Sequence, residues 1–446
     1  MDGNRFSAFI LAAMLALAGA VSAQDDGEER KYANVKTTKV KAISQKLAKQ
    51  LEPVRTCLAP EGEEGEPVPE PDPRCAEKAL SKINTAKLPG HEKAEVWNLY
   101  GYTYYLLDDQ PKSKVYYLRI INEPEANAPL RNRTLKTVSQ ISLIEEKYAE
   151  ALKYYQDWMA LQEILGASDY ALLATIYYSL DNHNQALTNI EKSIEMMESA
   201  GKIGQENWYS LQRSIYYQRG NYPKVVSILK KLIANYQSPR YWRELGGMYG
   251  ELEVPKDQLA AYQVASLQKK GLTTEPQLMA LAYMYMGADV PYKGAEVIIA
   301  GIKSGKIKES EKNLRVLGSA LYQSGELKKA LPWMEKAASK ASDGESFARL
   351  AGIYVDLERY QDAIRTANEA LRRGGVKRRD LTLMTLGTAQ FNLQKFDAAI
   401  RSFRKIKDDR TIKNRDQWIQ YVQNEQKREE QIKASGIDLD RILGRS

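Results

Sequence analysis

A repeat with a mean spacing of roughly 36 residues constrains the fold of this 446-residue chain more than any other feature. Each unit has a large apolar residue, a second apolar residue three positions later, and then a small residue, except for Gln212 in the fourth unit. The spacing places both apolar residues on one face of a helix, and the small residue marks the close approach of a second helix. The large apolar residues are Trp97, Leu135, Tyr170, Trp208, Trp242, Leu278, Leu314, Phe347 and Leu383.

A second small residue recurs where a second helix of each unit would begin, although Val225 and Gln258 depart from this rule. The pattern resembles the tetratricopeptide repeat (TPR), most clearly in Trp242–Tyr249, and that resemblance implies scaffolding and not catalysis. One helical hairpin cannot bury its apolar face alone, so neighbouring hairpins must stack. We therefore predict an all-α fold, an α-solenoid of about nine TPR hairpins over residues 94–410. The second small residues are Ser113, Ala151, Ala186, Gly294, Ala330, Ala363 and Ala399.

The two ends of the chain fall outside the repeat. Arg5 precedes an apolar run from Phe6 to Ala18 and then small residues that end in Ala23, which predicts a cleaved signal peptide over 1–23 and an exported, periplasmic protein. Residues 24–93 are expected to form an N-terminal helical cap, with helices over 35–56 and 75–86. Residues 411–446 are expected to form a C-terminal capping helix and tail, in which Trp418, Tyr421 and Val422 cover the last repeat.

Cys57 and Cys75 are the two cysteines of the chain, and they flank an acidic, proline-rich stretch over 60–73. An exported compartment favours their pairing, so we expect a disulfide that pins a polar loop at its base. Two unpaired, buried thiols are the alternative.

Catalytic chemistry has few candidates in this sequence. We expect the two histidines, His91 and His183, to be solvated and packed, respectively, and no phosphate-binding glycine loop occurs. Neither histidine has a nearby Cys or His for metal binding. The sequence therefore predicts neither an enzyme nor a cofactor.

The inner groove of a helical solenoid is its default binding surface. Tyr and Arg predominate among the first-helix side chains expected to face it, and both residue types are enriched at protein interfaces. Packing alone would also explain so many tyrosines. The predicted groove residues are Asn98, Tyr102, Tyr105, Lys136, Tyr178, Arg243, Tyr283, Arg315 and Tyr322.

The positive charge is concentrated near the C-terminus. Residues 372–446 hold eighteen Lys and Arg against ten Asp and Glu, which accounts for the whole net charge of +8. Export disfavours nucleic acid as the partner, which leaves anionic lipid, cell-wall polymer or an acidic protein segment. A solvated helix end is the simpler interpretation. The predicted basic patch comprises Arg372, Arg373, Lys377, Arg378, Arg379, Arg401, Arg404 and Lys405.

A narrower resemblance rests on the segments 207–213, 241–252 and 286–295, together with the signal peptide. These look like the exported TPR proteins encoded beside TonB, ExbB and ExbD in Gram-negative bacteria. The resemblance implies an accessory periplasmic component of TonB energy transduction, with envelope proteins or outer-membrane receptors as partners. A scaffold of a polysaccharide-export or cell-wall assembly machine is the alternative. The insertion between Cys57 and Cys75 departs from that family.

Overall fold

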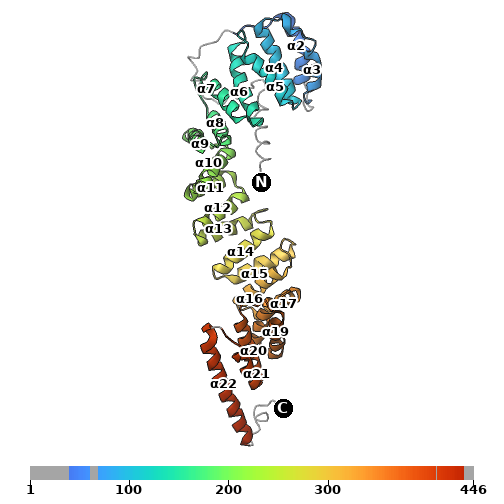
Figure 1. Ribbon diagram of the computed structural model, residues 1–446. Coiled ribbons are helices and arrows are strands. Elements are labelled where there is room, and N and C mark those ends of the chain that lie inside the picture. The colour runs from blue at the N-terminus through green and yellow to red at the C-terminus, as the bar shows by residue number, and fades with distance from the viewer. Residues whose placement is uncertain (1–39, 61–68, 408, 436–446) are drawn as a thin grey trace. The chain divides into compact units, whose positions relative to one another are not determined.

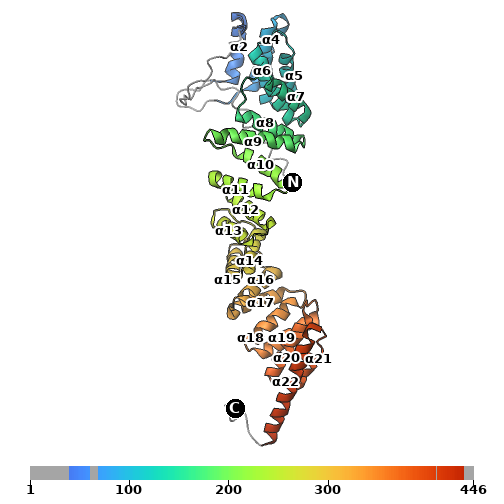
Figure 2. The ribbon, with the colours of Figure 1, turned by 90° about the vertical axis from the view of Figure 1, so that its left-hand side faces the viewer.

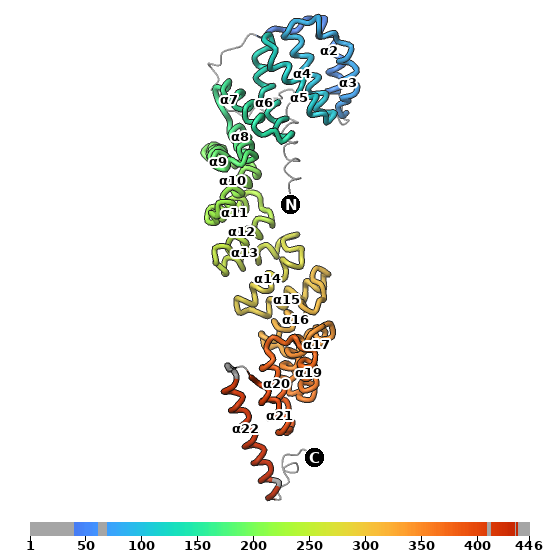
Figure 3. The backbone as a smooth tube through the Cα atoms, in the orientation of Figure 1, coloured from blue at the N-terminus to red at the C-terminus, as the bar shows by residue number. Residues whose placement is uncertain are grey.

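The structure is a computed structural model that describes residues 40–60, 69–407 and 409–435, and every regular element within these ranges is a helix (Figures 1 and 3). This confirms the all-α solenoid. The chain divides into two compact units, Met1–Asn221 and Tyr222–Ser446. The predicted signal peptide and most of the acidic loop lie outside the described residues.

The first unit contains the N-terminal cap and three complete helical hairpins, followed by one further helix. Consecutive α-helices in this unit pack against one another, and Figure 1 labels them in chain order. Its helices are α2 (Gln45–Leu58), α3 (Pro73–Leu80), the short 3₁₀ helix η2 (Thr85–Lys87), α4 (Gly90–Leu106), α5 (Gln110–Ile121), α6 (Ala128–Ile144), α7 (Tyr148–Met159), α8 (Ala167–Ser179), α9 (His183–Ser199) and α10 (Glu206–Gln218).

The second unit begins with a single helix and continues through five hairpins to a long final helix (Figure 2). The unit boundary falls inside the predicted fourth repeat, where Gln212 and Val225 break the sequence pattern. Its helices are α11 (Tyr222–Tyr236), α12 (Pro239–Glu251), α13 (Pro255–Leu267), α14 (Glu275–Gly287), α15 (Pro291–Lys303), α16 (Glu311–Gln323), α17 (Leu327–Lys340), α18 (Glu345–Asp356), α19 (Tyr360–Arg373), α20 (Arg379–Asn392), α21 (Phe396–Arg404) and α22 (Asp409–Ala434).

Four first helices carry a glycine that makes room for a side chain sixteen positions later, namely Gly101, Gly246, Gly318 and Gly387. A methyl group at Gly246 would lie 2.5 Å from Cδ2 of Tyr262, and one at Gly387 would lie 2.3 Å from Cε1 of Phe403. These distances are shorter than packed carbon atoms tolerate, so a residue larger than glycine does not fit at these positions. The small residue recurs in the repeat pattern because the two helices of a hairpin are in close contact at that position.

A left-handed residue follows each first helix of the repeat array. It is glycine at Gly220 and Gly325 but carries a side chain at the other turns, for example at Asp289 and Glu358. The residue after it donates its N–H back into the helix, as Glu326 does to the carbonyl of Leu321 at 2.9 Å. This is the Schellman geometry that ends helices. The nine turns contain Asp108, Glu146, Asp181, Gly220, Glu253, Asp289, Gly325, Glu358 and Gln394.

The N-terminal cap is a disulfide-linked hairpin, as expected. Cys57 on α2 and Cys75 on α3 are bonded, with their Cα atoms 5.7 Å apart. The helix α3 ends at Leu80, earlier than the predicted 86, and a 3₁₀ turn follows. Asp72 caps α3 by accepting the N–H of Cys75 at 3.0 Å. The described helices thus confirm the hairpin but shorten both arms, because α2 begins at Gln45 and residues 40–44 of the predicted helix over 35–56 are not helical.

The C-terminal helix α22 covers the last hairpin. Val422 is fully buried, and the Trp418 ring lies 5.7 Å from the ring of Phe403. Tyr421 lies against Phe391 at 5.3 Å but stays 49% exposed. The helix begins at Asp409, two residues before the predicted boundary at 411.

Candidate functional site

Three of the predicted groove residues meet in one pocket of the first unit. Asn98, Tyr102 and Tyr105 occupy successive turns of α4 and line a pocket of about 270 Å³. Four helices form the walls, because α2, α5 and α6 also contribute side chains. The full lining is Arg55, Leu58, Ala59, Asn98, Leu99, Tyr102, Tyr105, Tyr117, Arg133, Thr134 and Thr137.

Two arginines make the pocket cationic. Arg55 comes from α2 and Arg133 from α6, both are exposed, and neither has an ion pair among the described residues. No carboxylate lines the pocket. Burial raises the pKa of Glu95, which lies one turn before Asn98 on α4. The positive charges of Arg133 and Arg55 oppose this rise but do not cancel it. The site therefore presents guanidinium groups that a carboxylate of a partner could pair with.

Tyrosine hydroxyls supply the neutral polar groups of the pocket. Burial raises the pKa of Tyr102 and of Tyr105, so both phenols remain protonated donors at neutral pH. Buried Tyr117 forms the base of the pocket. Its ring packs closely on α4, because a methyl group at Gly101 would lie 2.7 Å from its Cζ. Apolar rings, hydroxyl donors and two guanidiniums suit an extended peptide with both apolar and anionic groups.

The other two predicted groove residues of the first unit are held by neighbouring repeats. The Lys136 ammonium pairs with Asp169 at 2.6 Å and lies 4.2 Å from the centre of the Trp158 ring. The Tyr178 hydroxyl lies 3.2 Å from the hydroxyl of Ser214 and accepts a hydrogen bond from Gln218. Both side chains therefore link consecutive repeats, and neither lines the pocket.

The predicted groove residues of the second unit do not gather in a described pocket. Arg243 donates to the backbone carbonyl of Gly271 at 2.6 Å, and Arg315 pairs with Glu311 within α16. Tyr283 is 45% exposed. A hydrogen bond to Asp356 is the main reason that the pKa of Tyr322 is raised. Their role in partner binding stays a prediction.

The predicted basic patch separates into two groups. Arg372 and Arg373 both bind Glu369, and these hydrogen bonds lower the pKa of that carboxyl to about 2. Arg373 also donates to the carbonyl of Ala341 at 2.8 Å. The remaining members are exposed and have no ion pair in the described part of the chain: Lys377, Arg378, Arg379, Arg401, Arg404 and Lys405.

The sequence predicted three of the eleven residues that line this pocket. Arg55 and Leu58 lie in the cap, outside the repeat period, and Arg133 precedes the first apolar position of its repeat. Arg133, two residues before Leu135, lines the same pocket as Asn98 of the preceding repeat. This position would have to be included in a search for groove residues.

Within 40–60, 69–407 and 409–435, no cluster of three or more His, Cys, Asp or Glu could hold a metal ion. The His183 ring packs 5.3 Å from that of Tyr178, as predicted. His91 is partly exposed, and its Nδ1 is buried without a hydrogen-bond partner among the described residues. None of the described helices is both long and apolar enough to span a membrane.

The geometry defines a helical-repeat protein with a pocket between its hairpins. The family model of the tetratricopeptide repeat matches residues 170–198, which form the hairpin of α8 and α9. The chain therefore contains a TPR unit at the position of the third predicted repeat. No curated protein sequence matches the chain.

Solved structures of several other proteins are similar to this chain at low identity. The crystal structure of MamA has 14% identity and a TM-score of 0.32, and the match covers 36% of this chain and 90% of that one. The TPR2AB domain of yeast Sti1, in a complex with pHSP90, has 14% identity and a TM-score of 0.24, with 66% and 98% covered. The C-terminal part of a TPR protein from Cytophaga hutchinsonii has 13% identity and a TM-score of 0.37, with 55% and 97% covered.

Proposed function

We propose that this chain is a non-catalytic scaffold that holds a segment of a partner protein in the pocket of its first unit. One observation carries the proposal: Arg55 and Arg133, both without ion pairs among the described residues, flank a tyrosine-lined pocket that contains no carboxylate. Helical repeats stack into surfaces suited to extended segments, and Arg and Tyr dominate the energetics of such interfaces.

The chemistry of the pocket selects the kind of segment. A carboxylate can pair bidentately with a guanidinium, while an apolar side chain fills the space above Tyr117. Asn98 and the two phenols can bond the peptide backbone. The proposed ligand is an extended peptide in which an apolar residue stands beside Asp or Glu.

We further propose that the scaffold acts in an exported, oxidising compartment. The leader-like residues 1–23 and the Cys57–Cys75 disulfide support this placement. The resemblance over 207–213, 241–252 and 286–295 supports a role as an accessory component of TonB energy transduction. An envelope protein of that system would then supply the acidic segment.

The exposed basic patch favours one other candidate function. Six cations without ion pairs in the described residues could bind an acidic polymer, as a scaffold of polysaccharide export or cell-wall assembly would require. Screening by salt would weaken such binding steeply. Partner capture that depends on Arg404 and Lys405 but not on Arg55 would favour this second function.

Photo-crosslinking in cells identifies the partner. A photoreactive residue at Asn98, inside the pocket, should capture a protein that a reactive residue at the exposed Glu195 of α9 does not. Capture of TonB, an ExbB-type protein or an outer-membrane receptor supports the TonB role. Capture of polymer-export components supports the alternative, and equal capture from both positions contradicts binding in the pocket.

A peptide titration tests the chemistry of the site. A fluorescent Gly/Ser peptide that carries one Phe beside a Glu, called here the Phe–Glu peptide, should bind the full chain. Arg55→Gln and Arg133→Gln should each weaken binding about tenfold or more, because charged hydrogen bonds contribute about 1.5–3 kcal/mol. Arg219→Gln, which removes a cation of the first unit outside the pocket, is the matched control. Undiminished binding by both pocket variants would exclude this site.

A further inference from the structure

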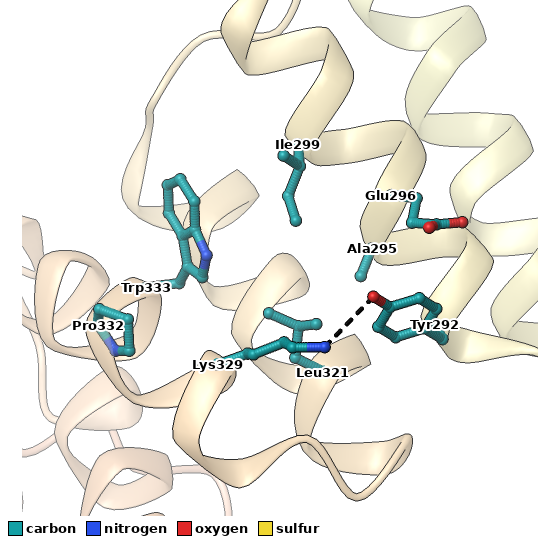
Figure 4. Close-up of a pocket in the computed structure, with 8 residues that line it drawn as sticks. All are labelled: Tyr292, Ala295, Glu296, Ile299, Leu321, Lys329, Pro332 and Trp333. Atoms are coloured by element: carbon teal, nitrogen blue, oxygen red, sulfur yellow. Dashed lines mark hydrogen bonds between the residues drawn. The ribbon is translucent and has the colours of Figure 1, made fainter.

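A second pocket lies on the opposite set of helices, in the second unit. Tyr292, Ala295, Glu296 and Ile299 form one face of α15, and Lys329, Pro332 and Trp333 face them from α17 (Figure 4). The pocket measures about 280 Å³, and buried Leu321 is its floor. Both walls are second helices of consecutive hairpins, whereas the pocket of the first unit is built mainly on first helices.

The interior of this pocket is apolar and has the size of a bulky side chain. Trp333 and Ile299 are only partly buried by the core they pack against, and Tyr292 is 39% exposed. Ala295 leaves space between them because its side chain is small. The opening is therefore suited to an aromatic or branched aliphatic residue of another protein.

The charged groups at the rim of this pocket determine which charge a bound segment should carry. The Lys329 ammonium is already paired with Glu326 at 3.2 Å, and it donates to the Tyr292 hydroxyl at 3.4 Å. Glu296 is exposed and has no ion pair in the described part of the chain. The charge left open at the rim is therefore negative.

One further group suits a peptide backbone. The nitrogen-bearing edge of the Trp333 indole faces the hollow in Figure 4, where it can donate to a backbone carbonyl.

We propose that this pocket is a second docking site, which binds a partner segment that presents a bulky apolar side chain next to a Lys or Arg. The apolar side chain enters between Ile299 and Trp333, and the cation meets Glu296. The charge preference is opposite to that of the first pocket, so one chain would hold two different segments. This site does not depend on the function proposed for the first unit.

The indole of Trp333 reports binding directly. The full chain is labelled with 5-fluorotryptophan, and the resonance of Trp333, one of six tryptophans, is assigned by Trp333→Phe. A Gly/Ser peptide with one Phe and a nearby Lys, the Phe–Lys peptide, should shift this fluorine resonance. The same peptide with Phe replaced by Ser should not shift it.

A charge exchange tests the role of Glu296 without altering the core. Replacement of the peptide Lys by Glu should weaken binding to the native chain about two- to fivefold, the range of an exposed ion pair. Glu296→Lys should reverse this preference by a similar factor. Glu251→Lys, at an exposed end of α12, is the matched control and should keep the native preference.

Three outcomes would overturn the proposal. The Trp333 resonance could remain unmoved by the Phe–Lys peptide, or Glu296→Lys could leave the charge preference unchanged. Sedimentation could also show self-association that Glu296→Lys abolishes, in which case a second copy of the chain is the occupant.

Discussion

The carboxylate of Glu275 accepts a hydrogen bond from the backbone N–H of Lys308 at 2.9 Å. Glu275 stands in the first turn of α14, and Lys308 lies in the loop that leads to the next hairpin. Asn313 on α16 donates to the same carboxylate at 3.0 Å. The bond therefore ties the start of one hairpin to the entry of the next. It recurs at Glu345 with the N–H of Lys377 at 3.0 Å and at Asp380 with the N–H of Lys407 at 3.3 Å.

Stability of the second unit should depend on the charge of Glu275. The Lys308 N–H is the main cause that lowers its pKa below the usual 4.5, followed by Asn313. A lowered pKa in the folded state means that the contribution is fully present above about pH 4.5 and is lost as the pH falls through the folded-state pKa. Glu275→Gln should therefore reduce the unfolding free energy at neutral pH, by at most about 1 kcal/mol for a partly exposed group.

Urea unfolding at several pH values checks this expectation. The difference between Glu275→Gln and the native chain should shrink as the pH falls below 4.5. Glu251→Gln, without an ion pair in the described residues, should show no such pH-dependent difference. A constant difference for Glu275→Gln over the whole pH range would remove the inter-repeat role of this carboxylate.

Two adjacent glycines of α12 should respond to substitution in opposite directions. Gly246 faces Tyr262, so Gly246→Leu should lower the unfolding free energy by roughly 1–3 kcal/mol through overpacking. Gly247 has no atom within 4 Å of an added methyl group, so Gly247→Ala should raise stability by about 0.5–1 kcal/mol through helix propensity. Thermal melting of both variants is the measurement. Equal effects at the two positions would contradict the assigned repeat register.

The repeat period predicted the hairpins because it reflects contacts between residues at fixed sequence distance. Gly246 and Tyr262 meet because the two antiparallel helices of this hairpin pack closely, so a small residue stands at that position. Turn geometry is equally local. A sequence pattern of this kind can therefore identify the fold. It does so even where Gln258 replaces the small residue, because Gly250 supplies the space. A methyl group at Gly250 would lie 2.5 Å from Nε2 of Gln258.

The pockets could not be predicted in the same way. Arg55 reaches the first pocket from a cap that lies outside the repeat period, and its position depends on how that cap packs. Arg243, a predicted groove residue, donates to the carbonyl of Gly271 in the loop after α13, and the repeat period did not predict this hydrogen bond. Pairings between residues of different repeats are decided by side-chain reach, which the period does not encode.

Arg243 should therefore act on stability, in contrast to Tyr283. Arg243→Ala removes the hydrogen bond to Gly271, which should lower the unfolding free energy by about 1 kcal/mol. Tyr283 is 45% exposed, so Tyr283→Ala should change stability by less than about 0.5 kcal/mol. Chemical denaturation of the two variants makes the comparison. A neutral Arg243→Ala would mean that this guanidinium is available to a partner, as the sequence alone suggested.

The Cys57–Cys75 disulfide should support both the fold of the cap and ligand binding. It closes a loop with a sequence separation of 18, so replacement of both cysteines by Ser should cost roughly 3 kcal/mol of stability in the chain-entropy model. Arg55 lies two residues before Cys57, and Leu58 directly follows Cys57. If α2 loosens when the disulfide is lost, one wall of the first pocket is lost with it. The double Ser variant should therefore melt at a lower temperature and bind the Phe–Glu peptide more weakly. Arg55→Gln should weaken binding without lowering the melting temperature, which separates the two effects. If the double variant binds as tightly as the native chain, the cap does not form part of the site.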